Sequence, residues 1–341
     1  MKNTQRPRFS VIIPAHNAAG TLPACLSSLS AQKLAREQFE IIVVDDRSTD
    51  RTRAVAEPCV ERYVYGSFAS VAAVRNAGAR HARGTLLAFL DADVVADVRW
   101  LVSADHYCTL GGFRGVLGFA DRPPSDAQWV GRTWNDPHRQ RYSERREFDF
   151  LPSRNLIVPA DLHHRMGGFD EALFAGGRAG EDKAYCYRFR EAGYPVLCDP
   201  GLTMIHLGYE KDLVQFVCKE WWRQSNTLAI ARAFGYPKRL LKNPLMSLMH
   251  LVAMGMILWP SRSESARPRA LAAAFWTLPS LLLVLRRTDL RGGIRILPAS
   301  WLLNWLRWNV AGIALLAQTG AACGRRLTKH IGRQRSLGTG N

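Results

Sequence analysis

The chain has 341 residues, of which 47% are hydrophobic and 22% are charged. This length suits one large domain or two smaller ones, and this composition excludes a disordered or collagen-like chain. The formal charge of +17 is unevenly spread, since residues 1–207 carry 26 basic and 24 acidic side chains whereas residues 208–341 carry 20 and 5. We interpret the chain as a catalytic module followed by a region that contacts an anionic surface, either a membrane or a nucleic acid.

The seven cysteines are odd in number and include no Cys-x-x-Cys pair. We therefore expect reduced thiols, without a disulfide framework or a zinc site. The apolar run at residues 9–13 is too short for a signal peptide, which favours a cytoplasmic catalytic part.

The first ninety residues alternate strand and helix signals. Short β-branched runs predict buried strands, and apolar positions at helical spacing predict helices between them. The predicted strands span residues 9–13, 40–44, 63–65 and 85–90, and the predicted helices begin at Thr21, Ser48 and Ser70. This order is typical of an α/β fold with a parallel sheet, which binds ligands at the carboxyl ends of its strands.

The second hundred residues are less regular. Residues 121–154 are polar and basic, and we expect them to form an irregular excursion or an active-site flap. Order returns with a strand at residues 155–158 and a helix at residues 180–192, which Gly193 ends.

Two carboxylates, Asp91 and Asp93, stand one residue apart at the end of a predicted strand. At a strand tip this spacing can direct both side chains to one side. Mg²⁺ and Mn²⁺ prefer such oxygen ligands and often bridge a carboxylate to substrate phosphates. Most Asp-x-Asp triplets are turn or cap residues, so the motif is weak by itself.

The context strengthens the metal interpretation, because six motifs follow one another in a recognisable order. They are Val11–Asn17 (VIIPAHN), Val43–Asp50 (VVDDRSTD), Val74–Gly78 (VRNAG), Phe89–Asp93 (FLDAD), Gly167–Glu171 (GGFDE) and Gly180–Asp182 (GED). In order and spacing this set resembles the family 2 inverting glycosyltransferases over residues 9–230. The resemblance implies a GT-A nucleotide-sugar-binding domain at residues 1–230, with a mixed, mainly parallel sheet and flanking helices. Arg47 departs from the pattern, since the family often has glycine there.

The resemblance also implies a donor site. The backbone around Pro14 and His16 would line the nucleotide pocket, and Asp46 would accept hydrogen bonds from the base or ribose. Arg75 would lie beside the base or diphosphate, and Asp91 near the ribose.

The same resemblance implies that Asp93 binds a divalent metal, Mg²⁺ or Mn²⁺, and that Asp182 is the general base. A metal can stabilise the departing nucleoside diphosphate, so one base on the opposite side of the sugar suffices for inversion. Because Asp182 begins a helix, free N–H groups are expected to keep it ionised.

Each assignment has a simpler alternative. Asp182 could merely cap its helix, and His206 is either a metal or diphosphate ligand or a buried structural histidine. Helix-cap or turn roles are favoured for Asp45, Asp50 and Asp170.

The C-terminal third, residues 231–341, has long uncharged runs. Residues 243–261 and 270–285 predict a membrane-embedded helical hairpin, and residues 296–324 predict an interfacial or third membrane helix. The alternative is a helical bundle that is not embedded in lipid.

We therefore expect a membrane-associated glycosyltransferase on the cytoplasmic face of a bacterial inner membrane. It would move a sugar from a nucleotide-diphosphate sugar to a lipid-linked or polysaccharide hydroxyl, with membrane lipids as partners. Alternatives are a polyprenyl-phosphate sugar synthase and a membrane-tethered scaffold without turnover. Nucleic-acid binding is disfavoured, because the basic residues alternate with long apolar runs.

Overall fold

The computed structural model describes residues 6–119, 121–141, 145–224, 226–235, 238–258, 267–287 and 296–337. The chain divides into two compact units, Met1–Asp212 and Leu213–Asn341.

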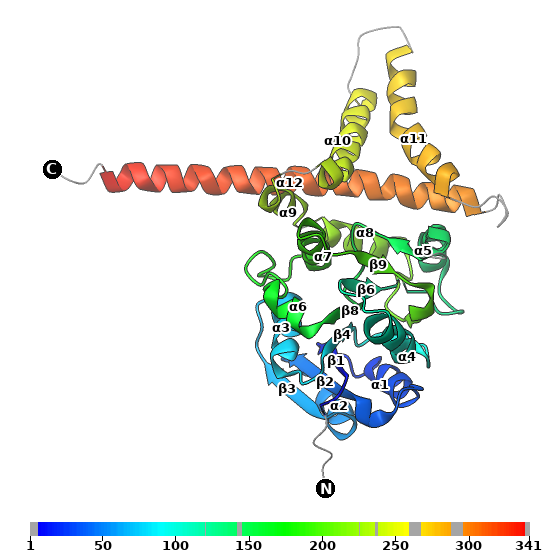
Figure 1. The fold of residues 1–341 in the computed structure, drawn as a ribbon. Helices are drawn as coiled ribbons and strands as arrows, with labels where there is room; N and C mark the ends of the chain where they lie inside the picture. The colour runs from blue at the N-terminus through cyan, green and yellow to red at the C-terminus, as the bar shows by residue number, and fades with distance from the viewer. Residues whose placement is uncertain are drawn as a thin grey trace. The chain divides into compact units, whose positions relative to one another are not determined.

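The first unit is built on an eight-stranded mixed sheet (Figure 1). Its strands, in spatial order, are β3 (Arg62–Gly66), β2 (Phe39–Asp46), β1 (Phe9–Ala15), β4 (Leu86–Leu90), β8 (Asn155–Pro159), β6 (Val116–Gly118), β9 (Val196–Cys198) and β7 (Arg146–Glu147). Strands β1 to β4 are mutually parallel, whereas β8 runs antiparallel to both β4 and β6. A separate antiparallel pair joins β10 (Met204–His206) to β5 (Val94–Ala96). The predicted α/β class and mixed sheet are confirmed.

Helices connect and flank these strands. They are α1 (Leu22–Ser30), α2 (Thr52–Ala56), α3 (Val71–His81), α4 (Trp100–Asp105), α5 (Trp129–Arg141), α6 (Ala160–Arg165) and α7 (Glu181–Glu191). Short 3₁₀ turns (Arg36–Gln38, Glu57–Cys59 and Pro200–Leu202) and one π-helical segment (His106–Leu110) complete the unit. The expectation of an irregular excursion over residues 121–154 is wrong, since α5 and β7 lie within it.

The sheet core explains the apolar runs in the sequence. Strands with helices on both faces have no solvent-facing side, and in β1 even Ser10 is fully buried. Helix α3 approaches β1 closely at Gly78, where a Cβ atom would lie 2.3 Å from Cγ2 of Ile12. The glycine of the VRNAG motif is therefore required by helix–strand packing.

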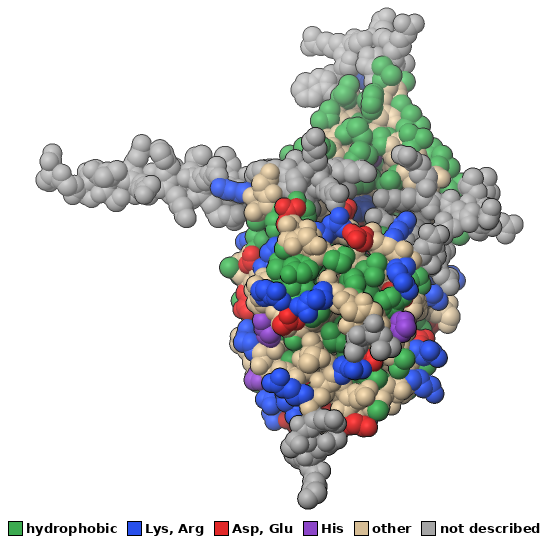
Figure 2. All heavy atoms as spheres, viewed as in Figure 1, with side chains coloured by type: hydrophobic (Ala, Val, Ile, Leu, Met, Phe, Trp, Pro, Cys, Tyr) green, Lys and Arg blue, Asp and Glu red, His purple; other side chains and the backbone are tan. Residues whose placement is uncertain are grey.

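The second unit is helical, with elements α8 (Leu213–Arg223), α9 (Thr227–Ala233), α10 (Lys238–Leu258), α11 (Arg267–Arg287) and α12 (Leu297–Leu337). Helices α10, α11 and α12 pack against one another. A hydrogen bond joins α11 to α12, because Nε1 of Trp276 donates to Oδ1 of Asn309 across 2.8 Å. Figure 2 shows hydrophobic side chains on the visible surface of α10 and α11. In these helices Leu245 is 62% exposed and Phe275 is 58% exposed.

The prediction of membrane-embedded C-terminal helices is wrong. Within the described segments, none of the helices combines the length and the apolarity that crossing a bilayer requires. The physical reason is that polar groups interrupt the apolar runs: α10 carries Ser247 and His250, and α12 carries Asn304 and Arg307. The predicted localisation at a membrane rested on those runs and is withdrawn with them. Residues 259–261 of the first predicted run lie outside the described residues.

Candidate functional site

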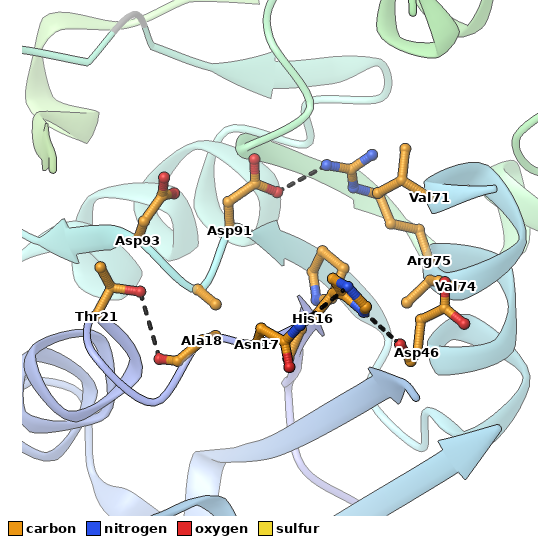
Figure 3. Close-up of a pocket in the computed structure, with 13 residues that line it drawn as sticks. His16, Asn17, Ala18, Thr21, Asp46, Val71, Val74, Arg75, Asp91 and Asp93 are labelled. Atoms are coloured by element: carbon orange, nitrogen blue, oxygen red, sulfur yellow. Dashed lines mark hydrogen bonds and ion pairs between the residues drawn. The ribbon is translucent and has the colours of Figure 1, made fainter. Parts of the chain in front are cut away.

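A pocket of about 410 Å³ opens where β1, β2 and β4 end (Figure 3). Parallel strands bring their carboxyl ends to one edge of a sheet, so the polar residues that follow them meet there. Six of the eight residues that the sequence proposed for the site line this pocket: Pro14, His16, Asp46, Arg75, Asp91 and Asp93. Asp182 and His206 lie outside this lining.

Two loops form one wall of the pocket and are tied to each other. Nδ1 of His16 lies 2.6 Å from the carbonyl oxygen of Asp46. The backbone N–H of Asn17 donates to Oγ of Ser48 across 2.8 Å, and Oδ1 of Asn17 accepts from the N–H of Thr49 at 2.8 Å. These contacts hold the loops after β1 and β2 in one arrangement.

Both loops need left-handed backbone. Asn17 has φ of 49° and Arg47 has φ of 56°. Only glycine adopts this region without steric cost, which explains why a glycine would suit the position of Arg47. The Arg47 side chain folds back, and its Nε lies 3.0 Å from Oδ1 of Asp46.

The acidic residues of the second loop divide into two roles. Oδ1 of Asp46 accepts from the N–H of Phe68 at 3.1 Å, and Asp46 is one of the residues that line the pocket. Asp45 accepts from the N–H of Ser48, and Asp50 accepts from the N–H groups of Ala19 and Thr52. The predicted turn and cap roles of Asp45 and Asp50 are confirmed.

Arg75 is the buried cation of the site. Its side chain is only 3% exposed and lies between two carboxylates, with Nη2 2.7 Å from Oδ1 of Asp91 and Nη1 2.9 Å from Oε1 of Glu181. Burial by itself lowers the pKa of the guanidinium, but Asp91 and Glu181 outweigh this and raise the pKa above its usual value. Arg75 therefore joins the end of β4 to the start of α7.

Asp182 is the second residue of α7, which begins after Gly180 at φ of 100°. Its Oδ1 accepts from the N–H of Lys183 across 2.7 Å. Burial and the adjacent Glu181 raise the pKa of Asp182 to about 6, although Lys183 and Arg75 oppose them. Desolvation and the like charge of Glu181 therefore exceed the effect of the N–H groups at the helix start, although a carboxyl group with this pKa is still ionised at neutral pH.

Asp93, which lines the pocket, lies beside His206, which is not part of the lining. Oδ2 of Asp93 lies 3.1 Å from Nε2 of His206. The backbone fixes this meeting, since the N–H of Leu207 donates to the carbonyl of Asp93 at 2.8 Å. Burial raises the pKa of Asp93, but His206 and Arg154 outweigh it and the pKa lies below its usual value.

The opposite edge of the His206 ring faces another carboxylate. Nδ1 of His206 lies 3.1 Å from Oδ2 of Asp121, whose side chain is 2% exposed. Oδ1 of Asp121 accepts from Nε and Nη2 of Arg154 at 2.8 and 2.5 Å, and Oδ2 accepts from the hydroxyl of Tyr209. Burial raises the pKa of Asp121, whereas Arg154 and His206 lower it by more, so this carboxylate stays ionised.

The pair of Asp93 and His206 fits a divalent cation. Neighbouring ligands at about 2.1 Å from an octahedral cation lie about 3 Å apart, close to the observed 3.1 Å. Gly208 lets the backbone lie directly against this pair, because a Cβ there would stand 2.2 Å from Oδ2 of Asp93 and 3.0 Å from Nε2 of His206. Within the residues that the structure describes, no group of three or more His, Cys, Asp or Glu side chains is arranged around a metal. Such a cation would therefore need further ligands from the substrate or water.

The fold and pocket agree with a family comparison. The model of glycosyl transferase family 2 matches residues 10–185, about half of the chain. The chain belongs to glycosyl transferase family 2, as its motifs indicated.

Curated relatives cover the same region. Validoxylamine A glucosyltransferase of Streptomyces hygroscopicus subsp. jinggangensis is 34% identical over 227 residues, which cover 56% of this chain and 53% of that protein. Glycosyltransferase AglE of Haloferax volcanii is 28% identical over 201 residues, 56% of this chain and 64% of that protein. A PGL/p-HBAD biosynthesis glycosyltransferase of Mycobacterium bovis is 40% identical over 126 residues, 35% of this chain and 44% of that protein. The chain spans only about half the length of these relatives.

Among solved structures, the mannosyltransferase PcManGT of Pyrobaculum calidifontis, in complex with GDP-Man and Mn²⁺, superposes with a TM-score of 0.56. The two sequences are 19% identical, and the match covers 91% of this chain and 88% of that one. At this identity the likeness establishes the fold alone, which is of the GT-A type.

The sequence missed several groups at the site. Asn17 and Ser48 stand inside quoted motifs, but only the folded loops reveal that they bond to each other. Asp121, Arg154 and Tyr209 carry no motif and come together from three distant segments. No local spacing would have found them.

Proposed function

We propose that this chain is an inverting glycosyltransferase that moves a sugar from a nucleotide-diphosphate sugar to a hydroxyl group of a glycan or lipid-linked acceptor. Its family membership and its GT-A fold support the class of reaction. The observation that carries the proposal is the link through Arg75, which joins the pocket at Asp91 to the helix start that bears Asp182.

The nucleotide would occupy the pocket between the loops after β1 and β2. Asp46 faces this pocket with a carboxylate that can accept hydrogen bonds from a base or ribose. Its Oδ1 is held by the N–H of Phe68, which orients the group before the donor binds. Asp91, oriented by Arg75, is suited to a ribose hydroxyl.

The diphosphate would lie toward Asp93 and His206. These two side chains would hold Mg²⁺ or Mn²⁺, since their separation fits neighbouring ligands of one cation. The cation supplies positive charge for the diphosphate that leaves. No general acid is then needed at the leaving group.

Asp182 would act on the acceptor. As the acceptor oxygen bonds to the anomeric carbon, its proton passes to the Asp182 carboxylate, the carbon–oxygen bond to the diphosphate breaks, and the nucleoside diphosphate leaves. Attack opposite the leaving group inverts the anomeric configuration. A pKa of about 6 suits this task, because the carboxylate is ionised at neutral pH yet more basic than an ordinary aspartate.

The substitution Asp182→Asn tests this proposal. The variant keeps the shape of the side chain but cannot accept the proton, so kcat should fall about 10²- to 10⁴-fold with donor affinity unchanged. Asp170→Asn is the matched control, since Oδ1 of Asp170 only accepts from the N–H of Leu173 in a turn. Turnover by Asp182→Asn at the wild-type rate would show that Asp182 is not the base.

A further inference from the structure

The His206 side chain is held between two carboxylates of different character. Nε2 lies beside Asp93 in the pocket, whereas Nδ1 lies beside Asp121 away from it, each at 3.1 Å. Because Nδ1 lies 3.1 Å from a carboxylate oxygen of Asp121, a proton on Nδ1 is attracted electrostatically to Asp121, while Nε2 keeps a lone pair for a cation.

Asp121 is already saturated by protein partners. Nε and Nη2 of Arg154 both donate to Oδ1 of Asp121, and Oδ2 accepts from the hydroxyl of Tyr209. A carboxylate with both oxygens occupied and a side chain 2% exposed is poorly suited to bind a metal itself. Its charge is balanced by Arg154, so it can remain ionised and attract a proton on Nδ1 of His206.

The backbone brings the two residues into this position. The N–H of His206 donates to the carbonyl of Arg122, the residue after Asp121, at 2.9 Å, and the N–H of Arg122 donates to the carbonyl of Met204 at 2.9 Å. The segment that carries Asp121 is thus aligned with β10, which carries His206. The arrangement is built into the strand register.

We propose that Asp121 is a positioning residue, which fixes the ring orientation and the Nδ1-protonated form of His206, so that Nε2 faces the cation beside Asp93. Arg154 holds Asp121 in place. This inference rests on the cation site of the proposed function. Carboxylates that orient histidine ligands in this way typically change metal affinity about 10- to 100-fold.

Asp121→Asn provides the test. An asparagine keeps the size of the side chain, but its amide can donate to Nδ1 and thereby favour the form of His206 that has a proton on Nε2. We expect Mn²⁺ affinity to fall about 10- to 100-fold. The readout is free Mn²⁺ by electron paramagnetic resonance, titrated into the full chain with UDP or GDP present, and it requires no turnover.

A double-mutant cycle with His206→Gln separates positioning from a general structural effect. If Asp121 acts through His206, adding Asp121→Asn to His206→Gln causes no further loss of Mn²⁺ affinity. Full additivity of the two losses would overturn the proposal, as would wild-type affinity in Asp121→Asn. If His206→Gln itself binds Mn²⁺ like the wild type, His206 is not a ligand and the proposal also fails.

Arg154→Lys covers the case in which Asp121→Asn does not fold. Lysine keeps the positive charge but cannot donate to Asp121 from two nitrogens as the guanidinium of Arg154 does. It should weaken Mn²⁺ binding only when His206 is present, and an equal loss in the His206→Gln background would contradict the proposal. Tight Mn²⁺ binding without sugar transfer would refute the proposed function while leaving this inference intact.

Discussion

Arg75 in α3 and Asp91 after β4 form an ion pair with Nη2 and Oδ1 2.7 Å apart, and the same guanidinium holds Glu181 at the start of α7. One buried side chain thus links the pocket at the strand ends to the segment that carries Asp182. Arg75 lines the pocket, as a position beside the base or diphosphate requires, and its hydrogen bonds go to two carboxylates of the protein.

Loss of this link should destabilise the domain. Arg75→Met would leave Glu181, which is 7% exposed, without its cationic partner, and breaking such a buried pair costs about 3–5 kcal/mol of unfolding free energy. Urea denaturation measures the change. Arg80→Met on the same helix is the control, because its pair with Glu171 is exposed and should contribute at most about 1 kcal/mol. Equal losses in the two variants would contradict the role of Arg75.

The pH dependence of catalysis should report Asp182. Because its pKa is about 6, the carboxylate becomes protonated as the pH falls through 6 and then cannot accept a proton. We expect kcat/KM to be level above pH 7 and to fall about tenfold per pH unit well below 6. Circular dichroism at each pH shows whether the protein stays folded. A level profile down to pH 5 would exclude Asp182 as the base.

The raised pKa of Asp182 also predicts that this catalytic candidate lowers the stability of the folded protein at neutral and higher pH. A carboxyl group whose pKa is higher in the folded than in the unfolded chain destabilises the fold above the folded value, and this penalty disappears below the unfolded value of 3.8. Asp182→Asn should therefore have a higher Tm than the wild type at pH 8, and this advantage should shrink toward pH 4. An advantage that grows as the pH falls would have the wrong sign.

Gly78→Ala tests the packing of α3 on β1. The new Cβ would lie 2.3 Å from Cγ2 of Ile12, and overpacking of this kind costs about 1–3 kcal/mol. Gly20→Ala is the matched control, since no atom lies within 4 Å of its Cβ position. Chemical denaturation with an unchanged m-value should show a lower midpoint for the first variant alone. Indistinguishable midpoints would mean that α3 shifts freely to accommodate the methyl group.

Donor binding can be measured without knowing the acceptor. We expect one nucleotide sugar from a panel of UDP-, GDP-, CMP- and dTDP-sugars to raise the Tm, with the larger part of the shift dependent on Mn²⁺ and reversed by EDTA. A ligand at 100 times its Kd stabilises by about 2.7 kcal/mol.

Gly208→Ala should remove the metal-dependent part of that shift, because its Cβ would stand 2.2 Å from Oδ2 of Asp93. An undiminished Mn²⁺ effect in Gly208→Ala would argue against a cation at Asp93.

The sequence by itself determined the fold class and one edge of the site. Apolar runs marked the parallel strands, and polar residues directly after them had to meet at a single edge of the sheet. For this reason His16, Asp46, Asp91 and Asp93 could be placed together from their positions in the chain, and they do line one pocket.

Only the tertiary structure decided the features that depend on distant segments. Asp121, Arg154 and Tyr209 surround His206 although no spacing links them, and Asp182 gains its raised pKa from burial that a helix-start argument cannot see. The C-terminal apolar runs led to the wrong prediction of membrane-embedded helices for a related reason. The lack of charge over a stretch of sequence does not count its Ser, Asn and His groups, which lower the apolarity that a membrane span requires. Local patterns therefore determined which elements form, whereas desolvation and long-range contacts decided what their side chains can do.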